Sequence, residues 1–327
     1  MKTSDFDYHL PEELIAQRPL EQRNESRMMI VRRDEGTIEH ARFADFPDLV
    51  EKDDLLVMND TRVVPARFFS NDETREILRV DIVGPRRWKC LVRPGKRFKV
   101  GRTVDIGTSI GTVIEICEEG GERIIEFDVE PDEDVHGHLA LPPYIARPDD
   151  STDTERYQTV FAKKAGAIAA PTAGLHFSDE MLSTLPHSFV TLHVGIGTFR
   201  PVSEEDMTKH HMHSEHYELE ASTVKAIGAA KRTIAIGTTV VRVLESCAGG
   251  SGESVLVAGK GETDIFIYPP YQFKVVDALL TNFHLPKSTL LMLVAALAGK
   301  NLMMEAYAKA VEERYRFFSY GDCMVII

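Results

Sequence analysis

The sequence predicts a mixed α/β protein that is interrupted by a small all-β unit. The segments before Val63 and after about residue 144 mix helix and strand patterns. Between them, from Val63 to about Pro131, short apolar runs alternate with Gly-rich turns and no helical period of useful length appears. Successive strands without helices form a barrel or a sandwich, so the chain combines two kinds of architecture.

The totals bound the class of protein. The chain has 327 residues, of which 43% are hydrophobic and 27% charged, as in a globular protein with a sizeable core. The net charge of −13 argues against a non-specific nucleic-acid coat protein. The uncharged run 289–298 is too short for a bilayer, and the N-terminus carries no signal-peptide pattern. We therefore expect a cytoplasmic protein without membrane contact, whose four cysteines are reduced.

The first part of the chain ends in a polar cluster. We expect a short helix after Pro11, a hairpin of 28–33 and 37–42, and a buried strand over 54–58. Four polar residues follow this strand: Asn59, Asp60, Thr61 and Arg62. The carboxyl end of a strand is a common place for ligand contacts in α/β proteins. A tight turn with side-chain capping explains the same residues equally well.

The last part of the chain alternates strands and helices. Ser178 is a capping residue with two acids in the following turn. The expected elements are helices over 154–164, 221–231, 240–247, 290–298 and 302–314, and strands over 189–194, 233–236 and 324–327.

The stretch 263–299 concentrates unusual features. We expect a strand at 265–268, a corner at Pro269 and Pro270, a second strand, and then a helix opened by Ser288. Four isolated polar residues stand among residues that should be buried: Asp264, Asp277, Asn282 and His284. A buried polar group needs a partner from the protein, from water or from a ligand. This pattern indicates a site mounted on a core.

Common nucleotide and hydrolase motifs are missing from the sequence. We find no P-loop, no strand-linked GxGxxG and no GxSxG elbow. The segment 210–216 has four histidines and a glutamate, which zinc could use. Structural zinc sites usually take ligands from two separate pieces of chain, so we favour an exposed loop and expect no metal.

Two sets of residues suggest binding or proton transfer. Thr238 and Thr239 follow Gly237 at a predicted helix start, which suits a carboxylate or phosphate. Arg242 and Glu245 fall on one face of that helix, where an ordinary surface ion pair is an equal alternative. Three histidines stand at comparable strand ends or turns: His176, His193 and His284. A single one would be a core histidine, but three favour a shared pocket with acid–base roles near neutral pH.

A cationic run stands apart in this acidic chain. Residues 86–102 contain eight Lys or Arg residues and no acid. The run is either a solvated strand face balanced by acids elsewhere or a contact to nucleic-acid phosphate. The candidates for RNA contact are Arg86, Arg87, Arg93, Lys96, Arg97 and Lys99.

Long motifs resemble one known family. The segments NDTRVVPAR, LVRPGKR, LPPYI, ERYQTVFA, APTAGLHF, TLHVGIGTFRPV, HMHSEHYE, EERYRFFSYGD and most of 264–295 resemble the S-adenosylmethionine:tRNA ribosyltransferase-isomerases of queuosine biosynthesis. The match runs in order over nearly the whole chain. Pro270 stands where the family pattern has glycine.

The resemblance implies an architecture and a reaction. The fold class would be α+β, with a mixed α/β main domain at 1–62 and 150–327 and an inserted small antiparallel β-barrel domain at 63–149. The enzyme would transfer and isomerise the ribosyl part of S-adenosylmethionine onto 7-aminomethyl-7-deazaguanine at the tRNA wobble position. Epoxyqueuosine-tRNA would form, and adenine and methionine would leave. We expect a monomer that uses S-adenosylmethionine as a cosubstrate and tRNA with a queuine-precursor base in the anticodon as its partner.

This chemistry assigns expected roles to residues. Aromatic faces and carboxylates suit a sulfonium cation, and groups that titrate near neutrality suit proton transfer. The expected catalytic groups are His176, His193, His284 and Asp277. The expected substrate contacts are Asn59, Asp60, Thr61, Arg62, Arg200, Thr238, Thr239, Arg242, Asp264, Tyr268, Tyr271 and Phe273.

Two other functions remain as alternatives. A tRNA-binding protein of the same fold without catalysis would bind the RNA but release no adenine. An ordinary methyltransferase would produce S-adenosylhomocysteine, and the missing Gly-rich motif counts against it.

Overall fold

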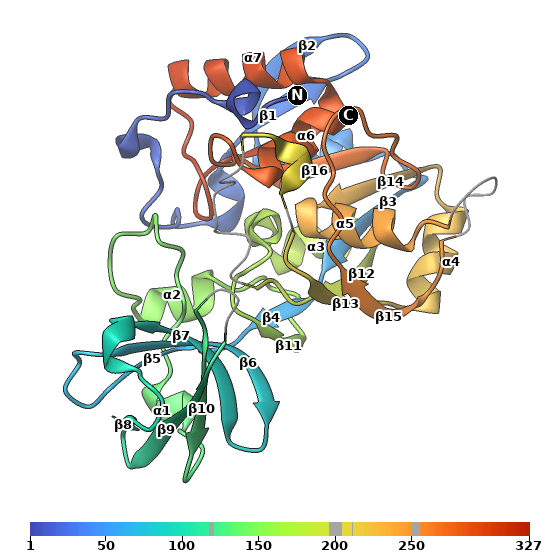
Figure 1. Ribbon diagram of the computed structural model, residues 1–327. Coiled ribbons are helices and arrows are strands. Elements are labelled where there is room, and N and C mark those ends of the chain that lie inside the picture. The colour runs from blue at the N-terminus through green and yellow to red at the C-terminus, as the bar shows by residue number, and fades with distance from the viewer. Residues whose placement is uncertain (118–120, 196–204, 211, 250–255) are drawn as a thin grey trace. The chain divides into compact units, whose positions relative to one another are not determined.

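The chain divides into two compact units. The computed structural model describes residues 1–117, 121–195, 205–210, 212–249 and 256–327 (Figure 1). The larger unit comprises Met1–Arg62, Pro143–Arg147 and Glu155–Ile327, and the smaller one comprises Val63–Pro142 and Pro148–Thr154. The first border falls between Arg62 and Val63. The chain then joins the larger unit at Pro143, earlier than the expected residue 150, and leaves it again for Pro148–Thr154.

The larger unit is built on a nine-stranded mixed sheet. Its strand order is β15-β13-β12-β3-β14-β16-β17-β1-β2. Strands β12, β3, β14 and β16 are parallel neighbours, and β17 is antiparallel to β16. The strands are β1 (Arg27–Arg32), β2 (Thr37–Arg42), β3 (Asp54–Asn59), β12 (His187–Leu192), β13 (Glu215–Leu219), β14 (Arg232–Ile236), β15 (Gly259–Thr263), β16 (Ala278–Asn282) and β17 (Cys323–Ile326). A two-stranded sheet pairs β4 (Thr61–Val63) with β11 (Lys164–Ala167).

The smaller unit is an antiparallel six-stranded sheet that is nearly closed into a barrel. Its order is β5-β6-β7-β10-β9-β8, and Asn71, just beyond β5, donates its backbone N–H to the carbonyl of Asp105 on β8 (3.1 Å). Trp88 is fully buried at its centre. The strands are β5 (Arg67–Phe69), β6 (Glu76–Gly84), β7 (Arg87–Arg93), β8 (Thr103–Ile106), β9 (Ser109–Ile116) and β10 (Arg123–Phe127). The predicted fold class, a mixed α/β body with a small β-barrel, is confirmed.

Helices complete both units. Ser178 caps α3 through its hydroxyl, which accepts from Met181 N (3.2 Å), and Ser288 caps α6 in the same way. The α-helices are α1 (Glu133–His136), α2 (Ser151–Arg156), α3 (Asp179–Thr184), α4 (Ala221–Ala229), α5 (Thr238–Cys247), α6 (Thr289–Ala298) and α7 (Lys300–Glu312). The 3-10 helices are η1 (Thr3–Phe6), η2 (Glu12–Leu14), η3 (Arg23–Glu25), η4 (Phe43–Leu49), η5 (Gly95–Arg97), η6 (Thr172–His176) and η8 (Met207–Lys209).

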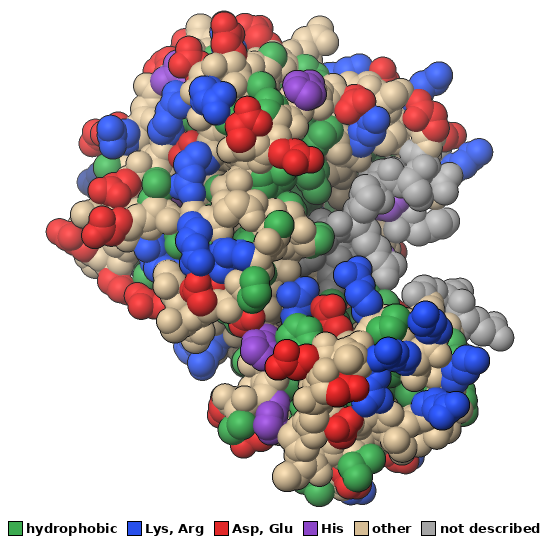
Figure 2. Space-filling model, turned by 90° about the vertical axis from the view of Figure 1, so that its left-hand side faces the viewer, with side chains coloured by type: hydrophobic (Ala, Val, Ile, Leu, Met, Phe, Trp, Pro, Cys, Tyr) green, Lys and Arg blue, Asp and Glu red, His purple; other side chains and the backbone are tan. Residues whose placement is uncertain are grey.

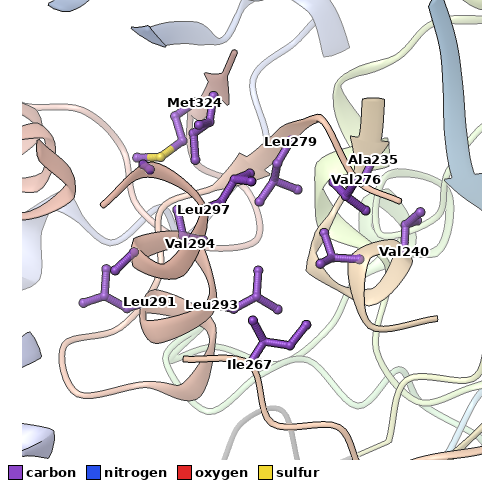
Figure 3. Close-up of a cluster of buried hydrophobic side chains, with 14 of the residues drawn as sticks. Ala235, Val240, Ile267, Val276, Leu279, Leu291, Leu293, Val294, Leu297 and Met324 are labelled. Atoms are coloured by element: carbon purple, nitrogen blue, oxygen red, sulfur yellow. The ribbon is translucent and has the colours of Figure 1, made fainter. Parts of the chain in front are cut away.

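The central strands are buried along their whole length. Every residue of β3 and of β16 is buried, as expected for parallel strands covered on both faces. Figure 3 shows part of this core, where side chains of α6 such as Leu293 and Val294 lie near Leu279 of β16 and Val240 of α5. The burial continues to the last residue of β16, so a polar side chain there is enclosed by protein.

Two predicted elements are wrong. The helix expected over 154–164 ends at Arg156. The strand expected at 265–268 does not form, and the chain from Asp264 to Asp277 has no regular structure. Its aromatic side chains pack against the main core instead of a neighbouring strand. Pro269 and Pro270 have no N–H to donate to a ladder, which disfavours a strand in this region.

A buried carboxylate of α5 holds this irregular segment. Glu245 is 3% exposed, and its carboxylate accepts backbone N–H groups from Lys274 (3.0 Å), Val275 (3.1 Å) and Val276 (3.1 Å). The Tyr271 hydroxyl donates to the same group (3.2 Å). These bonds replace the ladder that a strand would have provided.

Within the described residues, no single helix is long and apolar enough to cross a membrane. The helices α6 and α7 meet the length and composition test together but are bent by 117° at their junction.

We predict that Glu245→Ala destabilises the larger unit strongly. The change leaves the backbone N–H groups of Lys274, Val275 and Val276 without their acceptor, that of Val276 in a buried position, so the free energy of unfolding should fall by about 3 kcal/mol. Urea unfolding followed by circular dichroism measures this loss. The control is Glu305→Ala, which removes an exposed ion pair to Lys309 and should cost less than about 1 kcal/mol. Equal losses in both variants would contradict the role given to Glu245.

Candidate functional site

A hollow opens where the central parallel strands end. β14 and β16 run in parallel, with Ile236 beside Leu280. Gly237, at φ 95°, turns the chain from β14 into α5, a conformation that favours glycine. The hollow has a volume of about 730 Å³ and includes open solvent. It is lined by Tyr144, Tyr157, Ala169, Ala170, Pro171, Thr172, Ala173, Val194, Gly237, Thr238, Thr239, Thr281, Asn282, Phe283, His284, Leu285, Ser288, Leu290, Phe318 and Ser319.

The lining has a distinct chemical character. It contains hydroxyl, apolar and aromatic side chains, one amide and one imidazole, and no Asp, Glu, Lys or Arg among the described residues. Ligand sites are typically apolar clefts with a few placed polar groups, and the ends of parallel strands are a common position for them. The hollow is therefore our candidate site.

His284 is held firmly at the edge of this hollow. Its Nε2 lies 2.9 Å from the Thr281 hydroxyl, and its backbone N–H donates to the Tyr307 hydroxyl (2.9 Å). The Tyr8 hydroxyl donates to the carbonyl of His284. The turn after β16 thus fixes both the ring and the backbone of this residue.

His176 lies behind the hollow in a buried polar chain. Its Nε2 is 3.1 Å from Asn282 Nδ2, and its Nδ1 is 2.8 Å from the Ser26 hydroxyl. Asn282 lines the hollow, whereas His176 and Ser26 line a second one with Arg23 and Arg156. The side chain of His176 is therefore linked to the candidate site through Asn282.

Burial argues against the expected titration near neutral pH for these two histidines. Burial, together with the nearby Arg23 and Arg316 guanidinium groups, lowers the pKa of His176 to about 3. Burial likewise lowers the pKa of His284 to about 3. Both imidazoles are neutral at pH 7 and serve as hydrogen-bonding groups in this state.

His193 lies apart from the other two histidines. Its Nδ1 is 2.8 Å from the Thr61 hydroxyl, and it lines a third hollow with His216, Glu218 and Lys260. Burial and the neighbouring His216 lower its pKa. In the described part of the chain the three histidines thus line three different hollows, so the expected shared pocket is not found.

The polar cluster after β3 is mostly structural. Asn59 Nδ2 donates to Leu192 O (2.9 Å), and its Oδ1 accepts from the N–H groups of Leu192 (3.0 Å) and Thr61 (3.1 Å). Asp60 accepts from the Thr191 hydroxyl (2.6 Å). These bonds join β3 to β12. The bond from Thr61 N to Asn59 is the side-chain capping of a turn that we considered as the alternative to ligand contacts. Arg62 is exposed.

Of the residues of α5 that were expected to bind substrate, the two threonines line the hollow and the arginine does not. Thr238 and Thr239 line the hollow at an N-terminus that has no side-chain cap. Arg242 is 4% exposed and is paired with the buried Glu215, so the structure gives no support to its predicted contact to a substrate carboxylate. Glu215 also accepts from Gly195 N (2.9 Å). The alternative of a surface ion pair to Glu245 is wrong, because both groups are buried with other partners.

The residues expected in the corner 264–277 do not face the hollow. Asp264 is exposed. Asp277 accepts from Thr233 N (2.8 Å) at the amino ends of β16 and β14, the opposite edge of the sheet from Thr281. A strand rises about 3.3 Å per residue, which puts this carboxylate more than 10 Å from the site. Asp277 therefore does not line the candidate site, and this structure gives its predicted catalytic role no support.

The aromatic side chains of the corner serve the core. Tyr271 donates to Glu245, and burial raises its pKa to about 12. Phe273 packs edge-to-face on Tyr271 with ring centroids 5.0 Å apart, and Tyr268 packs on Phe266 at 4.8 Å. None of the three lines the described hollow, so the expected sulfonium platform is not placed there.

Some of the residues expected in the site lie outside the part of the chain that the structure describes. Arg200 lies outside the described residues, as does His211 of the histidine-rich segment. Among the described residues, no group of three His, Cys, Asp or Glu side chains is arranged to hold a metal ion.

The six cations expected to contact RNA are all exposed on the smaller unit. Figure 2 shows Lys and Arg side chains gathered on one side of that unit. Arg87 pairs with Glu126 (2.7 Å), and Arg86 donates to the carbonyl of Asp128. Arg97 donates to Thr74 Oγ1 (2.5 Å). No ion pair is found for the other three within the described ranges: Arg93, Lys96 and Lys99.

The sequence interpretation missed several members of the site. Asn282 was recognised as a polar residue in an apolar frame but was given no role. Tyr144 and Ser319, whose hydroxyls are 2.7 Å apart across the hollow, come from segments 175 residues apart. Only the polar-in-apolar pattern could have indicated Asn282, and no local signal marks Ser319.

We predict that burial of neutral His176 makes stability fall in acid. An unfolded histidine titrates near pH 6.5, whereas His176 titrates near 3 in the folded chain, so between these values only the unfolded state binds the proton. From pH 7 to pH 5 this residue should cost about 2 kcal/mol of unfolding free energy. His176→Gln should remove that part of the loss in urea titrations. The exposed His9→Gln is the control, and an equal pH slope in all three proteins would contradict the assignment.

Comparisons with known proteins identify the relatives of this chain. The family model described as queuosine biosynthesis protein matches residues 3–326. An S-adenosylmethionine:tRNA ribosyltransferase-isomerase of Desulforamulus reducens is 49% identical over 100% of both chains, and one of Natranaerobius thermophilus is 48% identical over 100% of this chain and 99% of that one. The crystal structure of an S-adenosylmethionine tRNA ribosyltransferase from Thermotoga maritima matches 99% of this chain and 100% of its own with 38% identity and a TM-score of 0.57. The resemblance seen in the motifs is thereby confirmed, and the chain belongs to the queuosine biosynthesis protein family.

Proposed function

We propose that this chain is an S-adenosylmethionine:tRNA ribosyltransferase-isomerase. The observation that carries the proposal is 49% identity over the full length to a relative of that name. A match of this length covers both the mixed α/β unit and the inserted barrel, so no part of the relative's chain is missing. The hollow at the ends of β14 and β16 supports the proposal because it is the kind of cleft that binds a small cosubstrate.

The reaction has two substrates. The ribosyl part of S-adenosylmethionine is transferred to the aminomethyl nitrogen of 7-aminomethyl-7-deazaguanine at the tRNA wobble position and is isomerised. Epoxyqueuosine-tRNA forms, and adenine and methionine leave. The scheme uses no metal ion, and the enzyme acts as a monomer in the cytoplasm on a tRNA that carries the queuine-precursor base.

Residues around the hollow take the roles that their positions allow. His284 is the proton-transfer group, because among the three histidines it alone lines the described hollow. Burial lowers the pKa of His284, so its neutral ring places no positive charge beside the cationic cosubstrate. Thr238 and Thr239 receive the methionine carboxylate at the start of α5, where helix N–H groups and the helix dipole favour an anion.

The smaller unit contacts the tRNA backbone through its cationic segment. Arg93, Lys96 and Lys99 are exposed and carry no ion pair within the part of the chain that the structure describes. Unpaired cations release counterions from phosphate when RNA binds, whereas paired ones must first lose their partner. Arg86, Arg87 and Arg97 extend this surface with side chains that already have protein partners.

We predict that the purified protein releases adenine and methionine in equal amounts from S-adenosylmethionine when modified tRNA is present. Chromatography of the products measures both. The variant His284→Ala should turn over at least roughly 100-fold more slowly, the scale of a lost acid–base group. Formation of S-adenosylhomocysteine would replace the proposal by a methyltransferase. Binding of the tRNA without any adenine release would indicate the non-catalytic alternative.

We predict that charge reversal of Arg93, Lys96 and Lys99 to Glu weakens tRNA binding. Each phosphate contact that is lost should also reduce the slope of log affinity against log salt by about 0.7 to 0.9. Filter binding at several salt concentrations measures both quantities.

The matched control for this variant has the same change in net charge at exposed lysines of the larger unit: Lys52, Lys225 and Lys231. Its salt slope should equal that of the unchanged protein. If both triple variants lose affinity equally, the binding surface lies outside the 93–99 segment.

A further inference from the structure

One buried acceptor beside the hollow has no partner. Asn282 is 2% exposed, and its Oδ1 makes no hydrogen bond among the described residues. An unpaired buried acceptor has lost its bonds to water without replacing them, so native structures rarely keep one without a reason. Asn282 lines the candidate site, and a ligand there can supply the missing donor.

The orientation of this amide is set by its surroundings. Its Nδ2 is within reach of three acceptors, namely His176 Nε2 (3.1 Å), Phe318 O (3.2 Å) and Asp322 O (3.3 Å). The opposite orientation would bring Oδ1 against two carbonyl oxygens, which can only accept. The amide nitrogen therefore faces these three acceptors, and Oδ1 points away from them.

His176 completes this arrangement by its tautomer. Because Asn282 donates to its Nε2, the proton of the neutral ring is on Nδ1, where it donates to the Ser26 hydroxyl (2.8 Å). A protonated ring would present N–H groups on both sides and would oppose the amide nitrogen. His176 thus acts on the hollow through Asn282 as a positioning residue.

The ligand group that meets Oδ1 is a neutral donor on an apolar body. The lining has no carboxylate among the described residues, so a buried ammonium would lack a counter-charge. Apolar walls come from Pro171, Ala173 and Phe283, and from the Tyr144 and Phe318 rings with centroids 4.5 Å apart. A flat heterocycle with an exocyclic amine satisfies both conditions, whereas a ribose hydroxyl belongs to a polar ring that gains little from such walls.

We propose that Asn282 Oδ1 accepts a hydrogen bond from the exocyclic amine of the adenine of S-adenosylmethionine, and that His176 and Ser26 hold the amide for this purpose. The inference rests on the proposed function and adds a specificity determinant to it. A 6-oxo base places an oxygen where the amine should be, so that two acceptors face each other. The site therefore selects a 6-amino purine over a 6-oxo purine.

The test compares two cosubstrates with the full chain and modified tRNA. The specificity constant kcat/KM is measured for S-adenosylmethionine and for S-inosylmethionine, its 6-oxo counterpart. The unchanged protein should prefer the 6-amino form by roughly 100-fold or more, as sites built to bond a polar group do. Efficient use of S-adenosylmethionine with equal use of S-inosylmethionine would overturn the inference and leave the proposed function intact. Transfer from neither cosubstrate would remove the proposed function instead.

Two variants distinguish a change in the preference for the base from a general loss of folded protein. Asn282→Ser replaces the amide with a shorter hydroxyl that no longer reaches the amine, and His176→Phe removes the partner that holds the amide, so each should reduce the preference to within about tenfold. A loss of folding alone would lower both specificity constants together and leave their ratio unchanged. His9→Gln is the control and should keep the ratio of the unchanged protein. A ratio that stays near 100 in a folded Asn282→Ser protein would contradict the role of Asn282.

Discussion

The larger unit depends on one constraint, which is the burial of a polar residue at the end of a fully buried strand. β16 is covered on both faces, so Asn282 cannot reach solvent. Its amide nitrogen is satisfied by His176 from η6 and by the carbonyls of Phe318 and Asp322 from the turn before β17. These bonds draw three distant segments around one point. The hollow lies beside Asn282, and the unpaired Oδ1 of this amide is a hydrogen-bond acceptor for a ligand there.

A second buried group performs a comparable task nearby. Glu245 on α5 takes the backbone N–H groups of 274–276, which have no strand to pair with. The helix therefore organises the segment that leads into β16. The same helix begins at Gly237 with Thr238 and Thr239 in the hollow. One element thus connects the irregular segment, the strand end and the candidate site.

Much of the fold was predictable because its signals are local. Apolar runs and turn residues indicated the β1 and β2 hairpin, β3, β14, α6 and α7 within a few residues, and the change of pattern at Val63 indicated the barrel. The run 265–268 was misleading because its β-branched and aromatic residues pack on the core without a neighbouring strand. Propensity describes which residues suit a half-buried surface, and it does not specify the partner.

The site was harder to predict because its residues depend on distant partners. Thr238, Thr239 and His284, which line the hollow, were proposed from strand and helix ends. Arg242 was assigned to a substrate carboxylate because nothing near it in sequence indicates that Glu215 is its partner. The acid–base role given to His176 at neutral pH relied on an ordinary pKa, which burial lowers to about 3. Asp277 looked like a residue of the site until the direction of β16 placed it at the opposite edge of the sheet.

The central claim is that the cosubstrate binds in the hollow at the end of β16. A crystal structure of the full chain with S-adenosylmethionine and the anticodon stem-loop of its tRNA would test this most directly. The account predicts the adenine ring between the walls of the hollow, with its exocyclic amine within hydrogen-bonding distance of Asn282 Oδ1. Adenine bound instead against Tyr268, Tyr271 and Phe273, with the hollow empty, would contradict it.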